Sequence, residues 1–212
     1  MLPDKVFLAS KSPRRLELLS SAFKNVEQIN SLLDEPKWHK NQSPAEYLKE
    51  CIAIKALGAR QAYELHRDKT QNNNTWVLIV AADTVVVRGQ ILYGKPENSK
   101  GAVQMLTELM GKEHVVQTAY YVGLYQSGVL QDEFQDLIST KVRFRKASTK
   151  EIETYVRTGE PLDKSGSYGV QGPALQFVEK VEGSYASVMG LPVFEIHKQV
   201  SLWEKKFLGN KV

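Results

Sequence analysis

A continuous apolar run covers residues 77–82 and predicts a strand that is buried on both faces of a sheet. Asp83 and Thr84 follow it, and the end of a buried strand is a common place for a ligand crevice in an α/β protein. Apolar stretches around a Gly-containing turn predict a hairpin over 85–93. The hairpin would return Lys95 to the neighbourhood of Asp83 and so bring an acid and a base together. The alternative is a core strand, an exposed turn and a surface lysine.

The rest of the chain alternates short apolar runs with amphipathic stretches. Further strands are predicted at 6–9, 26–33, 115–124, about 131–144 and 174–181. Helices are predicted after Ser12-Pro13, from Ser43 to about 65, from Asn98 or Ser99 to Gly111, from Ser148 to Gly159, and over 192–203. A polar turn is expected at 71–74 and a frayed tail at 204–212. This order of elements is that of an α/β protein.

Composition narrows the class of protein. The chain has 212 residues, of which 42% are hydrophobic, so we expect a real core in one domain over residues 1–212. The net charge of +4 is compatible with polyanionic ligands, but it is too small to indicate duplex nucleic acid. Cys51 is the only cysteine, which excludes a disulfide framework. The first residues do not resemble a signal peptide and no apolar run approaches a membrane span, so a cytoplasmic protein without membrane contact is expected.

The segment 10–15, Ser-Lys-Ser-Pro-Arg-Arg, links the first strand to the first helix. Ser12 is a good N-cap and Pro13 suits the first helical position. The free N–H groups of a first helical turn bind anions, and arginine pairs with phosphate oxygens through two hydrogen bonds. The segment therefore favours a phosphate site that includes Arg14 and Arg15; the alternative is an ordinary strand–turn–helix with solvated arginines.

Two other stretches carry candidate chemistry. Lys55 lies on a partly apolar helix face, where a lysine either serves a site or extends its ammonium to water. The segment 160–172, here called the glycine-rich loop, has glycine at every third position from Gly166 and contains an acid, a base and Gln171. Glycines allow a ligand to approach the backbone, whereas the apolar side chains of this loop argue against a merely flexible surface segment.

Together these motifs resemble the Maf family of nucleotide pyrophosphatases. The match rests on segments 10–15, 82–85, 94–96, 163–172 and 188–192, in this order over nearly the whole chain. The resemblance implies a mixed, twisted sheet flanked by helices, with two lobes and a deep cleft, akin to the inosine-triphosphate pyrophosphatase fold. It also implies hydrolysis of a nucleoside triphosphate to the monophosphate and pyrophosphate.

The resemblance assigns roles to individual residues. Asp83 matches the family's proton acceptor, and Glu35 matches an acidic residue that helps to hold a metal ion. The phosphate-site residues that match are Ser10, Arg14, Arg15, Lys55 and Lys95. Arg15, Thr84 and Gln171 match the residues that select the base in the dTTP/UTP branch. Ser165 and Ser167 depart from the alanines that are usual in the family and bear on base preference.

The expected activity is therefore hydrolysis of dTTP and UTP, with CTP or modified pyrimidine nucleotides as further candidates. The expected cofactor is Mg²⁺ or Mn²⁺, held by Asp83, Glu35 and phosphate oxygens, because hard cations prefer oxygen ligands. Asp83 either takes the proton of the attacking water or orients the water through the metal. A non-enzymatic nucleotide-binding regulator of cell division is the alternative, since the family name derives from a septum-formation phenotype. The resemblance further suggests a homodimer, and no nucleic acid partner is expected.

Overall fold

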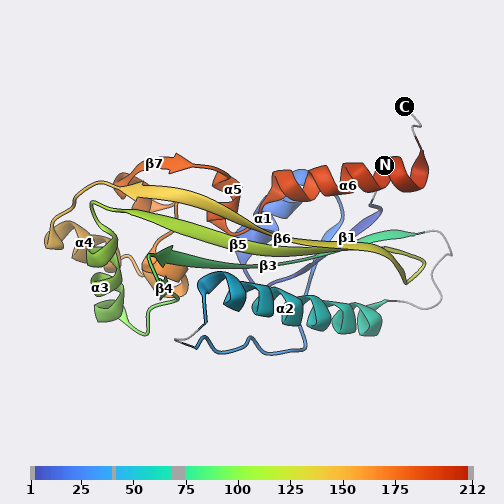
Figure 1. Cartoon of the computed structure of the whole chain (residues 1–212), viewed down its shortest axis with the longest axis horizontal. Helices are drawn as coiled ribbons and strands as arrows, with labels where there is room; N and C mark the ends of the chain where they lie inside the picture. The colour runs from blue at the N-terminus through green and yellow to red at the C-terminus, as the bar shows by residue number, and fades with distance from the viewer. Residues whose placement is uncertain (1–2, 40–41, 68–74, 210–212) are drawn as a thin grey trace.

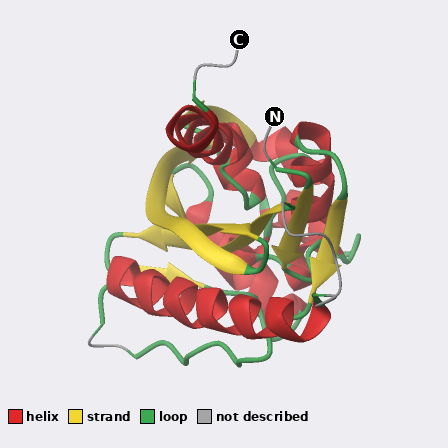
Figure 2. Cartoon of the chain, turned by 90° about the vertical axis from the view of Figure 1, so that its right-hand side faces the viewer, coloured by secondary structure: helices red, strands yellow, loops and turns green. Residues whose placement is uncertain are grey.

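The protein is a long, twisted sheet covered by helices on both faces (Figures 1 and 2). The computed structural model describes residues 3–39, 42–67 and 75–209, so the turn predicted at 71–74 lies outside the described residues. The strands are β1 (Lys5–Ala9), β2 (Val26–Ile29), β3 (Trp76–Arg88), β4 (Ile91–Tyr93), β5 (Glu113–Gln126), β6 (Val129–Phe144) and β7 (Val178–Glu182). The helices are α1 (Pro13–Ala22), α2 (Pro44–His66), α3 (Ser99–Leu109), α4 (Thr149–Val156), α5 (Tyr185–Met189) and α6 (Val193–Leu208).

The seven-stranded sheet has the order β2-β1-β3-β5-β6-β7, and β4 adds to β3 beside this path. β1 runs parallel to β2 and β3, whereas β3, β5, β6 and β7 are antiparallel neighbours. The sheet is therefore mixed, as the resemblance implied. Apolar residues on its two faces form separate cores, one under α2 and one under α1 and α6. A third core lies at the end of the molecule that holds α3 and α4, so the chain forms two lobes along the sheet (Figure 1).

β3 has one edge that is only partly covered. β1 pairs with it as far as Val80, and β4 begins to pair with it at Val86. Over residues 81–85, this edge of β3 faces no other strand among the described residues, while its other edge pairs with β5 throughout. Asp83 and Thr84 lie in this open segment. The prediction that Asp83 ends a strand was wrong, because the pairing with β5 continues through it and makes one long strand.

The alternation of β3 places these two neighbours on opposite faces. Odd-numbered residues such as Ile79 and Val85 pack in the core under α2, whereas even-numbered ones such as Leu78 and Val80 pack under α1 and α6. Asp83 accordingly faces α2, and Thr84 faces α1 and α5.

Most predicted helix starts are confirmed. Ser12, Ser43 and Ser148 are N-caps whose side chains accept from the backbone three residues on, and the last two form capping boxes. Asn98 caps α3. The longest helix, α2, spans 23 residues and buries one face, and no helix in the described segments is long and apolar enough to cross a membrane.

Three boundaries and one additional helix differ from the predictions. β2 ends at Ile29 rather than at 33, because β1 pairs with it only as far as that residue. Residues 173–177 form a 3₁₀ turn, since Pro173 offers no N–H to a ladder, and β7 starts after them. α5 was not predicted. α6 continues to Leu208 instead of fraying, because Phe207 packs on Trp76.

His114 anchors the glycine-rich loop to the sheet. Its Nε2 lies 2.8 Å from the Tyr168 hydroxyl oxygen, and both rings pack edge to face with Phe144. Burial lowers the pKa of His114 from 6.5 to about 4, and the positive charge of Arg88 adds to this shift. The folded protein therefore holds His114 neutral well below the pH at which the unfolded chain protonates it.

This difference predicts a loss of stability in acid. Above pH 6.5 His114 is neutral in both states and contributes nothing; as the pH falls from 6.5 towards 4, only the unfolded chain gains the proton, so the free energy of unfolding falls. The full pKa shift of His114 corresponds to a change of about 3 kcal/mol in the free energy of unfolding. Urea unfolding between pH 7 and pH 4 should show a steeper decline for wild type than for His114→Gln. Tyr168→Phe, which keeps the imidazole, is the control and should keep the steep decline; equal slopes for wild type and H114Q would contradict the prediction.

Candidate active site

A cleft of about 860 Å³ opens at the uncovered segment of β3. Its walls come from the β1–α1 connection, the segment after β2, α2, the residues after β4, the glycine-rich loop and the end of α5. All nine site residues predicted from the sequence line it: Ser10, Arg14, Arg15, Glu35, Lys55, Asp83, Thr84, Lys95 and Gln171. The sequence prediction thus selected residues that the fold brings to one place from six separate segments.

Lys55 joins two carboxylates in the cleft. Its Nζ lies 2.9 Å from Asp83 Oδ1 and 2.9 Å from Glu35 Oε1. The Lys55 side chain is only 10% exposed and that of Asp83 15%, whereas that of Glu35 is 58% exposed. Lys55 therefore does not extend its ammonium to water: α2 holds it against β3, where it neutralises the largely buried carboxylate of Asp83.

Arg15 is bound on every side by the protein itself. Its Nε donates to Gly190 O at 2.8 Å and its Nη1 to Ala82 O at 2.8 Å and to Ser10 Oγ at 3.3 Å. Its Nη2 donates to Thr84 Oγ1 at 3.2 Å. The bond to Ala82 O satisfies a carbonyl on the edge of β3 that no strand of the described residues covers. Arg15 therefore supplies a hydrogen bond that a neighbouring strand would otherwise donate.

Burial and charge act on Arg15 in opposite directions. Burial lowers the pKa of its guanidinium, while the carboxylates of Asp83 and Glu35 act to raise it. Arginine stays protonated in proteins even so. The positively charged Arg15 side chain is thus held close enough to Asp83 and Glu35 to interact electrostatically with both.

Arg14 is held much more loosely. Its closest charged partner is Asp163, with Nη1 and Oδ2 3.8 Å apart. Asp163 in turn accepts from Lys164 Nζ at 2.6 Å, and Lys164 also donates to the Glu160 carbonyl oxygen at 2.7 Å. Burial raises the pKa of Asp163, but hydrogen bonding from Lys164 and the positive charges of Lys164 and Arg14 outweigh it, so that this pKa lies below its ordinary value.

Asp163 and Lys164 line the cleft but were not among the predicted site residues. The sequence indicated these two residues only as the acid and the base of the glycine-rich loop. Lys95 and Gln171 are exposed at the cleft, and the N-cap Ser12 and first helical residue Pro13 of α1 line the same cleft.

Cys51 is no nucleophile for this site. It is buried, and burial raises its pKa to about 12, with the negative charge of Asp83 adding to the shift. The thiol is therefore protonated at neutral pH, and thiolate chemistry is excluded.

The cleft combines cations, a helix N-terminus and a lysine-bound carboxylate pair at the open edge of a mixed sheet. These features define a protein that binds a phosphorylated small molecule. The family model described as Maf-like protein matches residues 5–202. The chain therefore belongs to the Maf-like protein family.

Curated relatives match over almost their whole length. A dTTP/UTP pyrophosphatase of Hydrogenovibrio crunogenus is 37% identical over 194 residues, which cover 92% of this chain and 93% of that protein. The dTTP/UTP pyrophosphatase of Neisseria meningitidis is 36% identical, with 91% and 90% covered. Among solved structures, the Ham1 protein of Staphylococcus aureus is similar with a TM-score of 0.41 and 10% identity, covering 95% of this chain and 100% of that one.

The two arginines should behave differently when removed. Arg15→Ala leaves the Ala82 and Gly190 carbonyls without their donor, at about 1–3 kcal/mol per buried acceptor, so it should lower stability as well as activity. Arg14→Ala removes only a surface ion pair, worth about 0–1 kcal/mol, so the free energy of unfolding should hardly change. It should instead raise KM for a triphosphate, because a charge-assisted bond to phosphate is worth about 1.5–3 kcal/mol.

Urea unfolding and steady-state kinetics on both variants check this, with Arg14→Lys and Arg15→Lys as charge-conserving controls. Equal stability losses for R14A and R15A would contradict the different binding of the two side chains.

Proposed function

We propose that this Maf-family protein hydrolyses dTTP and UTP to the monophosphate and pyrophosphate, as a house-cleaning enzyme of the nucleotide pool. The observation that carries the proposal is the largely buried Asp83–Lys55 ion pair, which shares one cleft with Arg14, Lys95 and the N-terminus of α1. A protein that only binds nucleotide needs cations, but has no use for a carboxylate held beside the phosphates. The names of the relatives support the choice of base.

In this proposal Arg14, Lys55 and Lys95 bind the phosphates, and the first turn of α1 with Ser10 completes the phosphate site. Phosphoryl transfer depends on in-line positioning and on neutralising charge. Asp83 takes the proton of the water that attacks the α-phosphorus, and pyrophosphate leaves. Arg15 donates to Ser10 and Thr84 and so holds both in place, and its contact with phosphate stays part of the proposal.

A divalent cation, Mg²⁺ or Mn²⁺, fits the acidic side of the cleft. Among the described residues no group of three or more His, Cys, Asp or Glu could hold a metal ion by itself. Glu35 and Asp83 offer two carboxylates that already share one cation, the Lys55 ammonium. Mg²⁺ commonly binds through one or two carboxylates together with substrate phosphates. When bound there, the cation would neutralise charge on the phosphates and on the leaving group.

Thr84 and Gln171 select the base in this proposal. The Gln171 amide offers a donor and an acceptor, which suits the O4 and N3–H of thymine or uracil. Ser165, one of the departures from the family pattern, donates to the Thr84 carbonyl oxygen at 3.0 Å and so supports the strand that carries Thr84.

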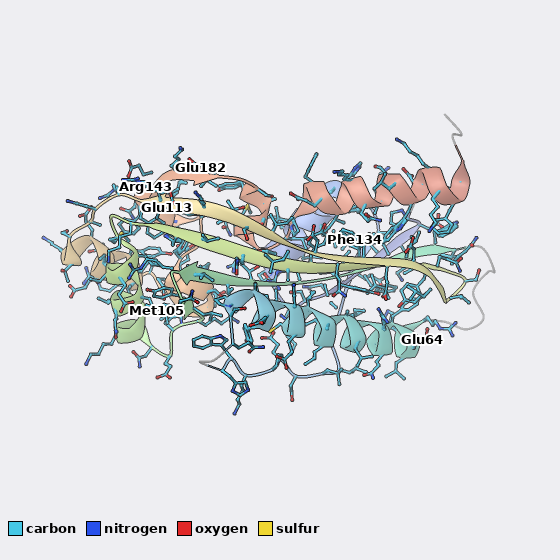
Figure 3. The ribbon with its side chains drawn as sticks, in the orientation of Figure 1. Glu64, Met105, Glu113, Phe134, Arg143 and Glu182 are labelled. Atoms are coloured by element: carbon cyan, nitrogen blue, oxygen red, sulfur yellow. The ribbon has the colours of Figure 1, made fainter. Side chains whose placement is uncertain are left out.

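Further parts of the proposal concern organisation and place. We propose one catalytic domain over residues 1–212, a homodimer, and the cytoplasm as the location, because nucleoside triphosphates are used there. Nucleic acid is not proposed as a partner. Acids and bases alternate on the surface, for example where Glu113, Arg143 and Glu182 lie at the β7 end of the sheet (Figure 3). Lys141 pairs with Glu113 at 3.7 Å and Arg143 with Glu179 at 3.5 Å, so this face offers no uniform positive charge.

Pyrophosphate release by the purified protein tests the function. In the presence of Mg²⁺ or Mn²⁺, kcat/KM should be highest for dTTP and UTP within a panel that includes CTP, ATP, GTP and 7-methyl-GTP. Addition of a chelator should abolish turnover. A protein that binds these nucleotides but releases no pyrophosphate would favour the non-enzymatic regulator instead.

Asp83→Asn is the matched variant in the same assay. Loss of a positioned proton acceptor costs about 10²–10⁴-fold in kcat, whereas nucleotide binding should persist because the cations remain. Asp136→Asn makes the same change at an exposed carboxylate of β6 outside the cleft; it is the control and should keep its activity. D83N activity above about a third of wild type would rule out this role for Asp83.

A further inference from the structure

Thr84 belongs to a chain of hydrogen bonds that runs from the cleft into the core. Thr84 on β3 lies directly opposite Thr118 on β5, and their hydroxyl oxygens are 2.9 Å apart. Thr84 lines the cleft, whereas Thr118 has no exposed surface. Thr118 also lies 2.8 Å from the carbonyl oxygen of Ser187 on α5.

The carbonyl at the buried end fixes the direction of this chain. A carbonyl oxygen can only accept, so the single hydroxyl proton of Thr118 goes to Ser187 O. Towards Thr84, Thr118 is therefore an acceptor, and Thr84 must donate its own proton to it. Arg15 Nη2, which can only donate, occupies one lone pair of Thr84 Oγ1 at 3.2 Å.

Thr84 is left with one lone pair and no proton for a ligand. We infer that Thr118 is a positioning residue that makes Thr84 a pure acceptor, and that this polarity selects uracil and thymine, which carry N3–H, over cytosine. The inference rests on the proposed function, in which Thr84 faces the base. Burial of Thr118 keeps water from reversing the direction of these hydrogen bonds, since its hydroxyl has no contact with solvent.

A fixed acceptor distinguishes uracil and thymine from cytosine, whereas the amide of Gln171 does not. Uracil and thymine offer a donor at N3 and an acceptor at O4, while cytosine offers an acceptor at N3 and a donor at N4. The exposed Gln171 side chain can turn over and present either its oxygen or its nitrogen. Thr84 cannot change its polarity, so with cytosine its lone pair would face the N3 lone pair.

Thr118→Val tests this inference by removing the acceptor for the Thr84 proton while keeping the shape of the side chain. Thr84 can then donate to a ligand, so kcat/KM for CTP should rise relative to UTP by roughly tenfold, as expected for one hydrogen bond at a base edge. Thr118→Ser keeps the hydroxyl and should keep the wild-type ratio. Both substrates are measured on one preparation, so that the folded fraction cancels from the ratio. An unchanged ratio in T118V, or an equal shift in T118S, would overturn the inference.

Thr84→Val provides a second test that does not depend on the folding of T118V. It removes the acceptor, so kcat/KM for UTP should fall several-fold more than that for CTP; equal losses would contradict an acceptor-only Thr84. Calorimetric titration with UTP and CTP separates this question from the proposed function. If neither wild type nor any variant releases pyrophosphate, the proposed function is wrong. Tighter binding of UTP than of CTP by wild type, and loss of this difference in T118V, would still support the hydrogen-bond chain. Equal binding of UTP and CTP by wild type would overturn it.

Discussion

The uncovered segment of β3 is the constraint on which the site depends. β1 stops pairing at Val80 and β4 starts at Val86, so the carbonyls between them need donors that no strand in the described part of the chain supplies. Arg15 donates to Ala82 O and Ser165 donates to Thr84 O. One side chain of α1 and one of the glycine-rich loop are thereby fixed at one edge of the sheet. A strand that extended β1 or β4 would cover this edge and close the cleft.

The alternation of β3 then separates two tasks between neighbouring residues. Asp83 faces α2, where Lys55 and Glu35 gather charge around it. Thr84 faces the other side, where Arg15 and Thr118 fix its hydroxyl. In the proposed reaction, Asp83 therefore acts on the attacking water from one face of the strand, and Thr84 contacts the base from the other. A single peptide unit joins them, so the distance between the two functions is set by the backbone itself.

Capping signals and apolar runs were enough to predict most helices and the long strands β5 and β6, whereas the residues of the cleft were assigned through the resemblance to the Maf family. Ser12 and Ser43 act locally, and local interactions are visible in the sequence. The continuity of β3 through Asp83 was missed, because it results from pairing with β5, which is more than thirty residues away. The different surroundings of the two adjacent arginines were missed for the same reason. Arg15 binds Gly190 and Ala82, and Arg14 pairs with Asp163, and all three partners are far away in the sequence. Hydrogen-bond direction at Thr84 likewise required the position of Ser187.

The central claim is that water attacks the α-phosphorus of a pyrimidine triphosphate at Asp83. Hydrolysis of UTP in ¹⁸O-labelled water, followed by mass spectrometry of the products, tests it most directly. The account predicts that the label enters UMP and that the pyrophosphate stays unlabelled, because the bond broken lies between the α-phosphorus and the bridging oxygen. Label in pyrophosphate, or release of labelled inorganic phosphate, would place the attack at another phosphorus and contradict the account.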